Sequence, residues 1–143
     1  MYICPVCDAE PGAHSFHKIH RKKDVEYYYT CPAQAKKYKD VEGIVKHYDG
    51  VLNQKDPDLQ WMWIFDCSGF NVHHMMEYQV GIRLAQLITG KYSGKLQKIY
   101  IINPNWYIFS MVTVVWPFLS KSVRDCIVYE GNDTYEFQVE PIK

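Results

Sequence analysis

The stretch from residue 98 to 119 limits most strongly what this chain can fold into, because it holds no charged residue after Lys98. Its first part, residues 99–102, is a short apolar run that stops at Asn103-Pro104-Asn105. Such a run, bounded by turn residues, is typical of a buried strand.

The second part, residues 106–119, predicts a helix that is apolar on nearly all sides, since only Ser110 and Thr113 are polar. Pro117 is expected to end or kink this helix, because proline lacks an N–H group. A helix of this kind must be covered on more than one side, by its own sheet and by a ligand, a partner or a membrane surface.

A membrane-spanning helix does not fit this stretch. The bilayer core requires about 20 continuous apolar residues. Here the Asn103-Pro104-Asn105 turn and Pro117 interrupt the run at both ends. A strand, a turn and an unusually apolar helix explain the pattern better.

Residues 61–65 predict a second buried strand, which delivers Asp66-Cys67-Ser68-Gly69 at its carboxyl end. Open α/β sheets place ligands and catalytic groups at that edge. Cys67 with His73 or His74 is the one nucleophile and base pair to consider. No Gly-x-Ser-x-Gly elbow is present, and no base is assigned to Cys67 by spacing, so we predict a protein that is not an enzyme.

The remaining segments predict an α/β fold with a mixed, mainly parallel sheet covered by helices. Further strands are expected at residues 16–19, 25–30, 127–129 and 135–139. One helix is expected from the cap Asp40 to residue 53, with Lys46 and His47 facing outward, and a longer one over residues 73–89. In the longer helix, Gly81 should permit close approach of a neighbour.

The first 31 residues hold the one cluster of metal-ligand types. Cys4 and Cys7 form a Cys-x-x-Cys pair, and His14, His17, His20 and Cys31 follow. A structural zinc site with ligands among Cys4, Cys7, His17, His20 and Cys31 is one interpretation. A pair of ordinary thiols near the chain end is the other, because the histidine spacing does not reproduce that of a zinc finger.

The composition of the chain limits which partners and which cellular compartment we expect. The 16 basic and 16 acidic residues give no net charge, which argues against nucleic acid as a partner. The chain opens without a signal-peptide pattern, and its five cysteines are irregularly spaced. We therefore expect a cytoplasmic protein, peripheral at membranes if it meets them, provided Met1 is the natural start.

Three segments of the sequence carry a family resemblance. LQKIYIINPNWYIFSMVTVVWPFLSKSVRDCIVY resembles the hallmark segment of the CRAL-TRIO lipid-binding domains, and its Pro104, Trp106 and Pro117-Phe118-Leu119 are similar to the BCH-type branch. Upstream, WMWIFDCSGF and LITGKYSGKL resemble that family's strand, Asp-x-x-Gly turn and connecting loop. The resemblance implies a single CRAL-TRIO-like domain over residues 15–143, preceded by a Cys/His-bearing extension over residues 1–14.

The resemblance also implies a function, which is non-enzymatic binding or transfer of a lipid or other small hydrophobic ligand. The sheet would floor a pocket, and the helix over residues 106–119 would act as a movable gate that also meets a bilayer surface. The residues expected to supply the apolar wall are Trp106, Phe109, Met111, Val112, Val115, Trp116 and Phe118. The residues expected to shape the surrounding turns, without a catalytic role, are Asp66, Gly69, Pro104 and Pro117.

BCH-type relatives suggest the alternative, a protein-interaction scaffold for a small GTPase, its regulator or a second copy of the chain. Gly94 and Cys126 stand where the phosphoinositide-handling members carry an acidic residue and a lysine. The resemblance therefore does not extend to phosphatidylinositol as the ligand.

Overall fold

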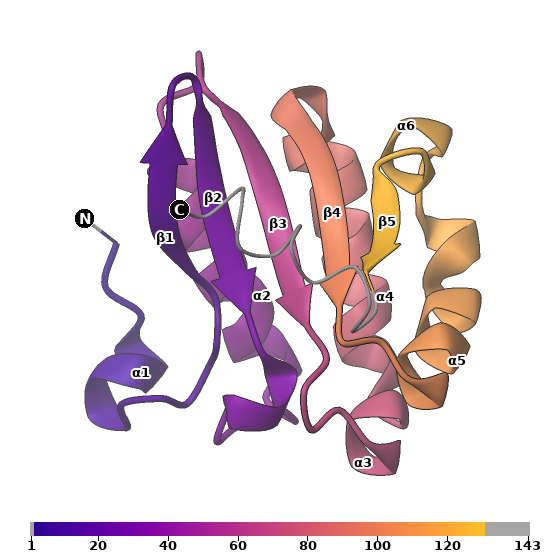
Figure 1. The fold of residues 1–143 in the computed structure, drawn as a ribbon. Helices are drawn as coiled ribbons and strands as arrows, with labels where there is room; N and C mark the ends of the chain where they lie inside the picture. Colours follow the sequence, from indigo (N-terminus) through magenta and orange to yellow (C-terminus); the bar gives the residue numbers. More distant parts are fainter. Residues whose placement is uncertain (1, 131–143) are drawn as a thin grey trace.

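The computed structural model describes residues 2–130 and contains one five-stranded sheet (Figure 1). The strands lie in the sheet in chain order. β1 pairs antiparallel with β2, and every later pair is parallel. The strands are β1 (His17–Lys22), β2 (Val25–Thr30), β3 (Gln60–Asp66), β4 (Leu96–Ile102) and β5 (Ile127–Glu130).

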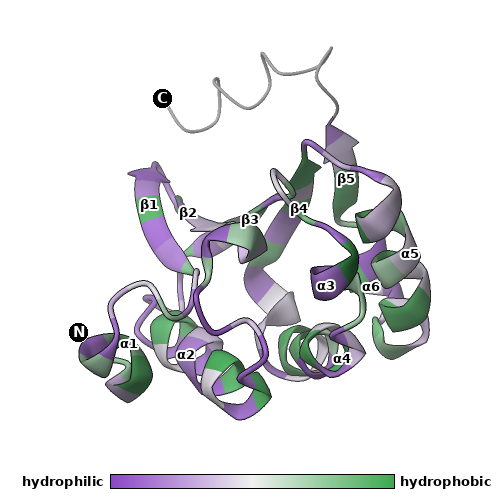
Figure 2. Cartoon of the chain, turned by 90° about the horizontal axis from the view of Figure 1, so that it is seen from below, coloured by the Kyte–Doolittle hydropathy of each residue, from purple (hydrophilic) through white to green (hydrophobic). Residues whose placement is uncertain are grey.

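One helix precedes the sheet, and the others lie in the connections between its parallel strands. The helices are α1 (Pro5–Ala9), α2 (Val41–Asn53), α3 (Val72–Met75), α4 (Tyr78–Leu87), α5 (Trp106–Val115) and α6 (Lys121–Arg124). When successive parallel strands are added in one direction through crossovers of one hand, the connecting helices fall on one face of the sheet. Figure 2 shows α2 and α4 together beneath the strands. The predicted mixed, mainly parallel α/β sheet covered by helices is confirmed.

The main core lies between the sheet and these helices. Alternate residues of β3 face it: Trp61 is fully buried and Trp63 nearly so. Met62 and Ile64 belong instead to a smaller cluster on the opposite face, as the two-residue period of a strand requires. The central strand is therefore buried on both faces, which explains its continuous apolar sequence.

Two helix predictions need correction. The helix expected over residues 73–89 is divided, because α3 ends before Met76 and α4 begins at Tyr78. The His74 ring lies 5.2 Å from the Phe70 ring and 5.1 Å from the Tyr38 ring, and these contacts hold α3 as a separate element.

The strand expected over residues 135–139 lies outside the described residues.

The second correction concerns α2. Asp40 caps this helix as expected, since its Oδ1 accepts from the Gly43 N–H at 3.2 Å. His47, expected to face outward, is buried. The N-terminal segment packs on that side of α2, and the periodicity of the helix itself cannot reveal such a cover.

Candidate functional site

An apolar cavity of about 90 Å³ lies between α5, α4 and the sheet, and we call it the α5 cavity. β3 and β4 supply its floor, α4 one wall and α5 the other. Its lining is Tyr38, Trp63, Phe65, Gly81, Leu84, Ala85, Ile99, Ile101, Ile108, Met111, Val112, Val115, Leu119 and Ile127. Pockets for drug-sized ligands occupy about 300–1,000 Å³, so this cavity is smaller than a lipid needs.

The side chains of α5 divide into an inner and an outer set. Of the residues expected to form a pocket wall, Met111, Val112 and Val115 line the α5 cavity. Trp106 and Phe109 of α5, and Trp116 and Phe118 of the 3-10 turn after it, do not line the cavity and are 67%, 45%, 40% and 39% exposed. Figure 2 shows α5 as hydrophobic over much of its length.

Four exposed aromatic side chains, on α5 and the turn that follows it, form an unusually apolar surface for a protein. α5 ends at Val115, and Pro117 lies in the 3-10 turn that follows. Within residues 2–130, no helix combines the length and the apolar character needed to cross a membrane.

Gly81 of α4 allows α5 to approach closely. A Cβ atom placed on Gly81 would lie 2.8 Å from the Met111 Sδ and 2.9 Å from the Val115 Cγ1. Real carbon contacts of this kind are longer, so glycine is required for the present spacing. The close approach predicted from the sequence is confirmed.

Hydrogen bonds join the turn after β3 to the segment that precedes α5. The Asp66 carboxylate accepts hydrogen bonds from the Tyr29 hydroxyl at 2.5 Å, the Ser68 N–H at 2.9 Å and the Asn103 amide at 3.2 Å. Burial alone would raise the pKa of Asp66, but these hydrogen bonds outweigh burial and lower it below the usual 3.8. Asp66 is thus an ionised acceptor that joins β2, its own turn and the segment before α5.

Two neighbours complete this connection. Gly69 adopts a positive φ of 78°, which favours glycine. Asn105 caps α5 by accepting from the Ile108 N–H, and its amide donates to the Phe70 carbonyl at 2.8 Å. Pro104 lies between Asn103 and Asn105, so three of the four turn residues expected from the sequence, Asp66, Gly69 and Pro104, lie near the start of α5, whereas Pro117 follows its end.

Cys67 lacks the surroundings of a nucleophile. Its side chain is buried, and burial raises the pKa of its thiol, which disfavours the reactive thiolate. The His74 Nδ1 accepts from the Asn71 N–H at 3.1 Å. No hydrogen bond joins Cys67 to His73 or His74 within the described chain.

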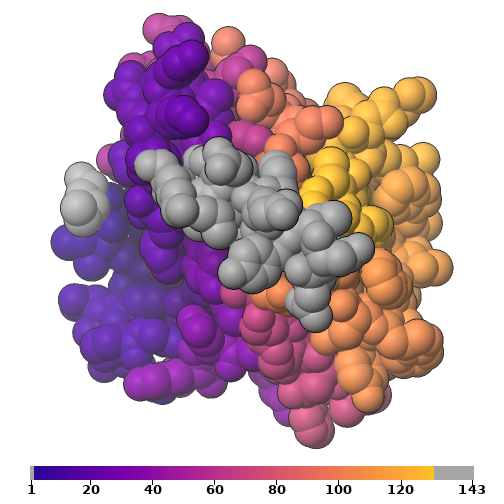
Figure 3. Space-filling model, viewed as in Figure 1, coloured from indigo at the N-terminus to yellow at the C-terminus, as the bar shows by residue number. Residues whose placement is uncertain are grey.

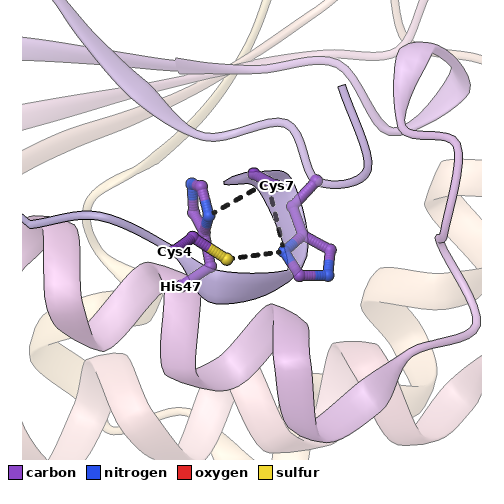
Figure 4. A group of neighbouring side chains, drawn as sticks. Cys4, Cys7 and His47 are labelled. Atoms are coloured by element: carbon purple, nitrogen blue, oxygen red, sulfur yellow. Dashed lines mark hydrogen bonds between the residues drawn. The ribbon is translucent and has the colours of Figure 1, made fainter. Parts of the chain in front are cut away.

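The structure places a Cys/His cluster at the N-terminal side of the molecule. Cys4, Cys7, His14 and His47 each offer one ligand atom, and these four atoms lie within 4.8 Å of one another. This group could hold a metal ion. Figure 4 shows Cys4, Cys7 and His47 pointing toward one another, with His47 projecting from α2.

The other residues expected as metal ligands lie elsewhere. His17 and His20 are on β1, where their rings contact Tyr29 and Tyr27. The Cys31 thiol donates to the Ser68 carbonyl at 3.6 Å. Sequence reasoning left His14 out of the ligand set and missed His47, which is 40 residues from Cys7. The one available signal was that the Cys-x-x-Cys pair required two further ligands.

Comparison with known proteins identifies the family of this fold. The family model described as the CRAL/TRIO domain matches residues 4–141. The crystal structure of Sfh5 is similar, with a TM-score of 0.63 at 13% sequence identity over 82% of this chain. The match covers 48% of the Sfh5 chain, and at this identity the likeness concerns the fold alone.

Proposed function

Because this chain belongs to the CRAL/TRIO domain family, we propose that it binds one lipid-like ligand non-covalently in an enlarged form of the α5 cavity, with α5 as the gate. Domains of this family typically bind or transfer lipophilic ligands and are in general not enzymes. The observation that carries the proposal is the apolar cavity between α5 and the sheet. The branch within the family is left open by this proposal.

The size of the cavity supports a movable α5. A cavity of about 90 Å³ admits a lipid only if one wall moves outward. The outer side of α5 already exposes Trp106 and Phe109, which suit contact with a bilayer surface while the wall is displaced. We therefore propose that α5 moves and that a membrane surface is where it does so.

One polar group in the lining bears on the ligand class. The Trp63 ring lines the α5 cavity, and its buried Nε1–H has no hydrogen-bond partner within residues 2–130. An unsatisfied buried donor costs about 1–3 kcal/mol. This atom is closed off in the present structure, so a hydroxyl or carbonyl oxygen of a hydrophobic ligand would reach it only in the enlarged form of the cavity. Phosphatidylinositol is not favoured as the ligand. The phosphoinositide-handling relatives carry a lysine where this chain has Cys126, and the Cys126 thiol instead faces the Leu96 and Ser122 carbonyls.

Native mass spectrometry of protein purified without detergent tests the proposal. We expect an additional mass of a few hundred daltons that is lost on denaturation and recovered in an organic extract. A bare protein mass together with a lipid-free extract would contradict ligand binding.

Replacing Ala85 with leucine should remove the ligand while preserving the fold. Ala85 is buried on α4 and lines the cavity, so the added carbons would occupy the free space. We expect lipid retained per protein to fall by about tenfold or more, equivalent to about 1.4 kcal/mol of binding free energy. The matched control is Gln86→Leu, at the exposed neighbouring position, which should retain the ligand.

A second candidate function is a protein-interaction scaffold, for a small GTPase, its regulator or a second copy of this chain. The observation that favours it is the exposure of Trp116 and Phe118 beside a shallow surface lined by Phe109, Pro117 and Tyr129. Light scattering after size-exclusion chromatography separates the two candidates. A stable dimer without lipid supports the scaffold, and a monomer carrying lipid supports the gated cavity.

A further inference from the structure

We propose that Cys4, Cys7, His14 and His47 bind one structural zinc ion, which fastens the N-terminal segment to α2. Neither the lipid-binding proposal nor family membership implies this site. It is carried by the positions of four side chains and by the hydrogen bonds behind them.

The spacing of the ligand atoms matches a tetrahedral zinc site. Zinc bound at about 2.3 Å from sulfur and about 2.0 Å from nitrogen separates these two atoms by roughly 3.6 Å. The His14 Nδ1 lies 3.5 Å from the Cys4 Sγ and 3.6 Å from the Cys7 Sγ. The His47 Nδ1 lies 3.6 Å from the Cys7 Sγ. Three of the six separations among the four ligand atoms thus agree with the edge of such a tetrahedron, and all six are within 4.8 Å.

The second nitrogen of each histidine is already engaged. The His14 Nε2–H donates to the Asp40 carboxylate at 3.0 Å, and the His47 Nε2–H donates to the Phe16 carbonyl at 2.8 Å. A carbonyl and a carboxylate accept hydrogen bonds, so the proton lies on Nε2 and each Nδ1 presents its lone pair to the sulfurs. Zinc-binding histidines in proteins show this same outer arrangement.

Thiol hydrogen bonds alone do not account for these contacts. Two thiol protons can satisfy at most two of the three sulfur–nitrogen contacts. A divalent cation interacts with all four groups at once, and two thiolates neutralise its charge. Two sulfur and two nitrogen ligands in a tetrahedron are typical of zinc.

The surrounding backbone holds the ligands in place. Cys4 and His14 are each 6% exposed and Cys7 is half-buried, so most of the site is turned away from solvent. The loop before His14 is tied to the segment after β2, since the Lys36 N–H donates to the Gly12 carbonyl at 2.9 Å and the Lys37 N–H to the Ala13 carbonyl at 2.8 Å. Figure 3 shows the N-terminal residues at one edge of the molecule and α5 at the opposite edge. Zinc and lipid binding can therefore be measured separately.

The test begins with metal analysis of the full chain, purified under reducing conditions without a metal-affinity tag. We expect one zinc per chain, and after exchange with Co²⁺ the absorption of a tetrahedral site with thiolate ligands. Removal of zinc by a chelator should lower the thermal midpoint by roughly 10 °C, and added zinc should restore it. A chain that takes up no zinc, or that holds iron or copper instead, would overturn the proposal.

Variants identify the ligands. Cys7→Ser and His47→Asn should each lose most of the bound zinc, whereas His17→Asn, His20→Asn and Cys126→Ser should retain it. Asp40→Asn preserves a helix cap and should weaken zinc binding by about 10- to 100-fold through His14. Zinc loss in the β1 histidine variants, with retention in His47→Asn, would contradict this ligand set. Lipid content should stay unchanged in all of them.

Discussion

Replacing both Trp106 and Phe109 with serine should reduce the partition of this protein onto phosphatidylcholine vesicles by about a hundredfold. Both side chains lie on the outer side of α5 and are largely exposed, so the change removes little from the folded core. Burying an aromatic side chain in an apolar phase is favourable by about 1.5–3 kcal/mol, and a loss of about 3 kcal/mol for the pair gives this factor. Vesicle co-sedimentation measures the partition, and the thermal midpoint should change little.

The matched control removes two exposed apolar side chains from other surfaces. Ile19 on β1 and Met76 between α3 and α4 are 39% and 60% exposed, and their double serine variant should bind vesicles like the wild type. If instead both double variants lose binding equally, α5 has no special part in membrane contact. Unchanged partition of the α5 variant would contradict the proposed gate.

Replacing Asp66 with alanine should lower the free energy of unfolding by about 2–3 kcal/mol. The change leaves the Tyr29 hydroxyl without its acceptor in a partly buried site and removes the hydrogen bonds from the Ser68 N–H and the Asn103 amide. Denaturant unfolding measures the loss. Asp58→Ala, in an exposed loop, should change stability by less than about 0.5 kcal/mol. A loss for Asp66→Ala no larger than for this control would show that the carboxylate does not brace the turn.

The same residue predicts a pH dependence. Because the pKa of Asp66 is lower in the folded protein than the usual 3.8, its contribution is fully present above about pH 4. It is lost as the pH falls through the lowered pKa. Wild-type stability should therefore decline more steeply below pH 4 than that of the Asp66→Ala variant. Parallel declines would contradict this assignment.

The sheet could be predicted because its central strands are buried on both faces. Residues 61–65 and 99–102 are continuous apolar runs, and both lie within observed strands. Asp40 and Gly81 were also predictable, since a helix cap and a close helix contact depend on one residue type at one position. Local sequence contains the information that these features require.

Of the Cys/His cluster, only Cys4 and Cys7 could be predicted from the sequence. Cys4 and Cys7 are close in sequence, but His47 reaches them because α1 packs beside α2, which is a tertiary contact. The size of the α5 cavity is likewise a property of packing, since it depends on how far α5 stands from the sheet. Hydrophobic periodicity shows which face of a helix is apolar. It does not show which element packs on that face, or how much space remains between the helix and that element.

The glycine at position 81 determines the resting distance between α4 and α5. A Cβ atom there would lie less than 3 Å from side-chain atoms of Met111 and Val115, so those side chains or α5 itself would have to shift. Outward displacement of α5 is also the movement that we propose for ligand entry. In that proposal, a single side chain on α4, remote from the exposed aromatic residues, would shift the balance between the closed and open forms. Under the proposed gate, ligand capacity would thus depend on the size of one cavity-lining residue at the contact between two helices.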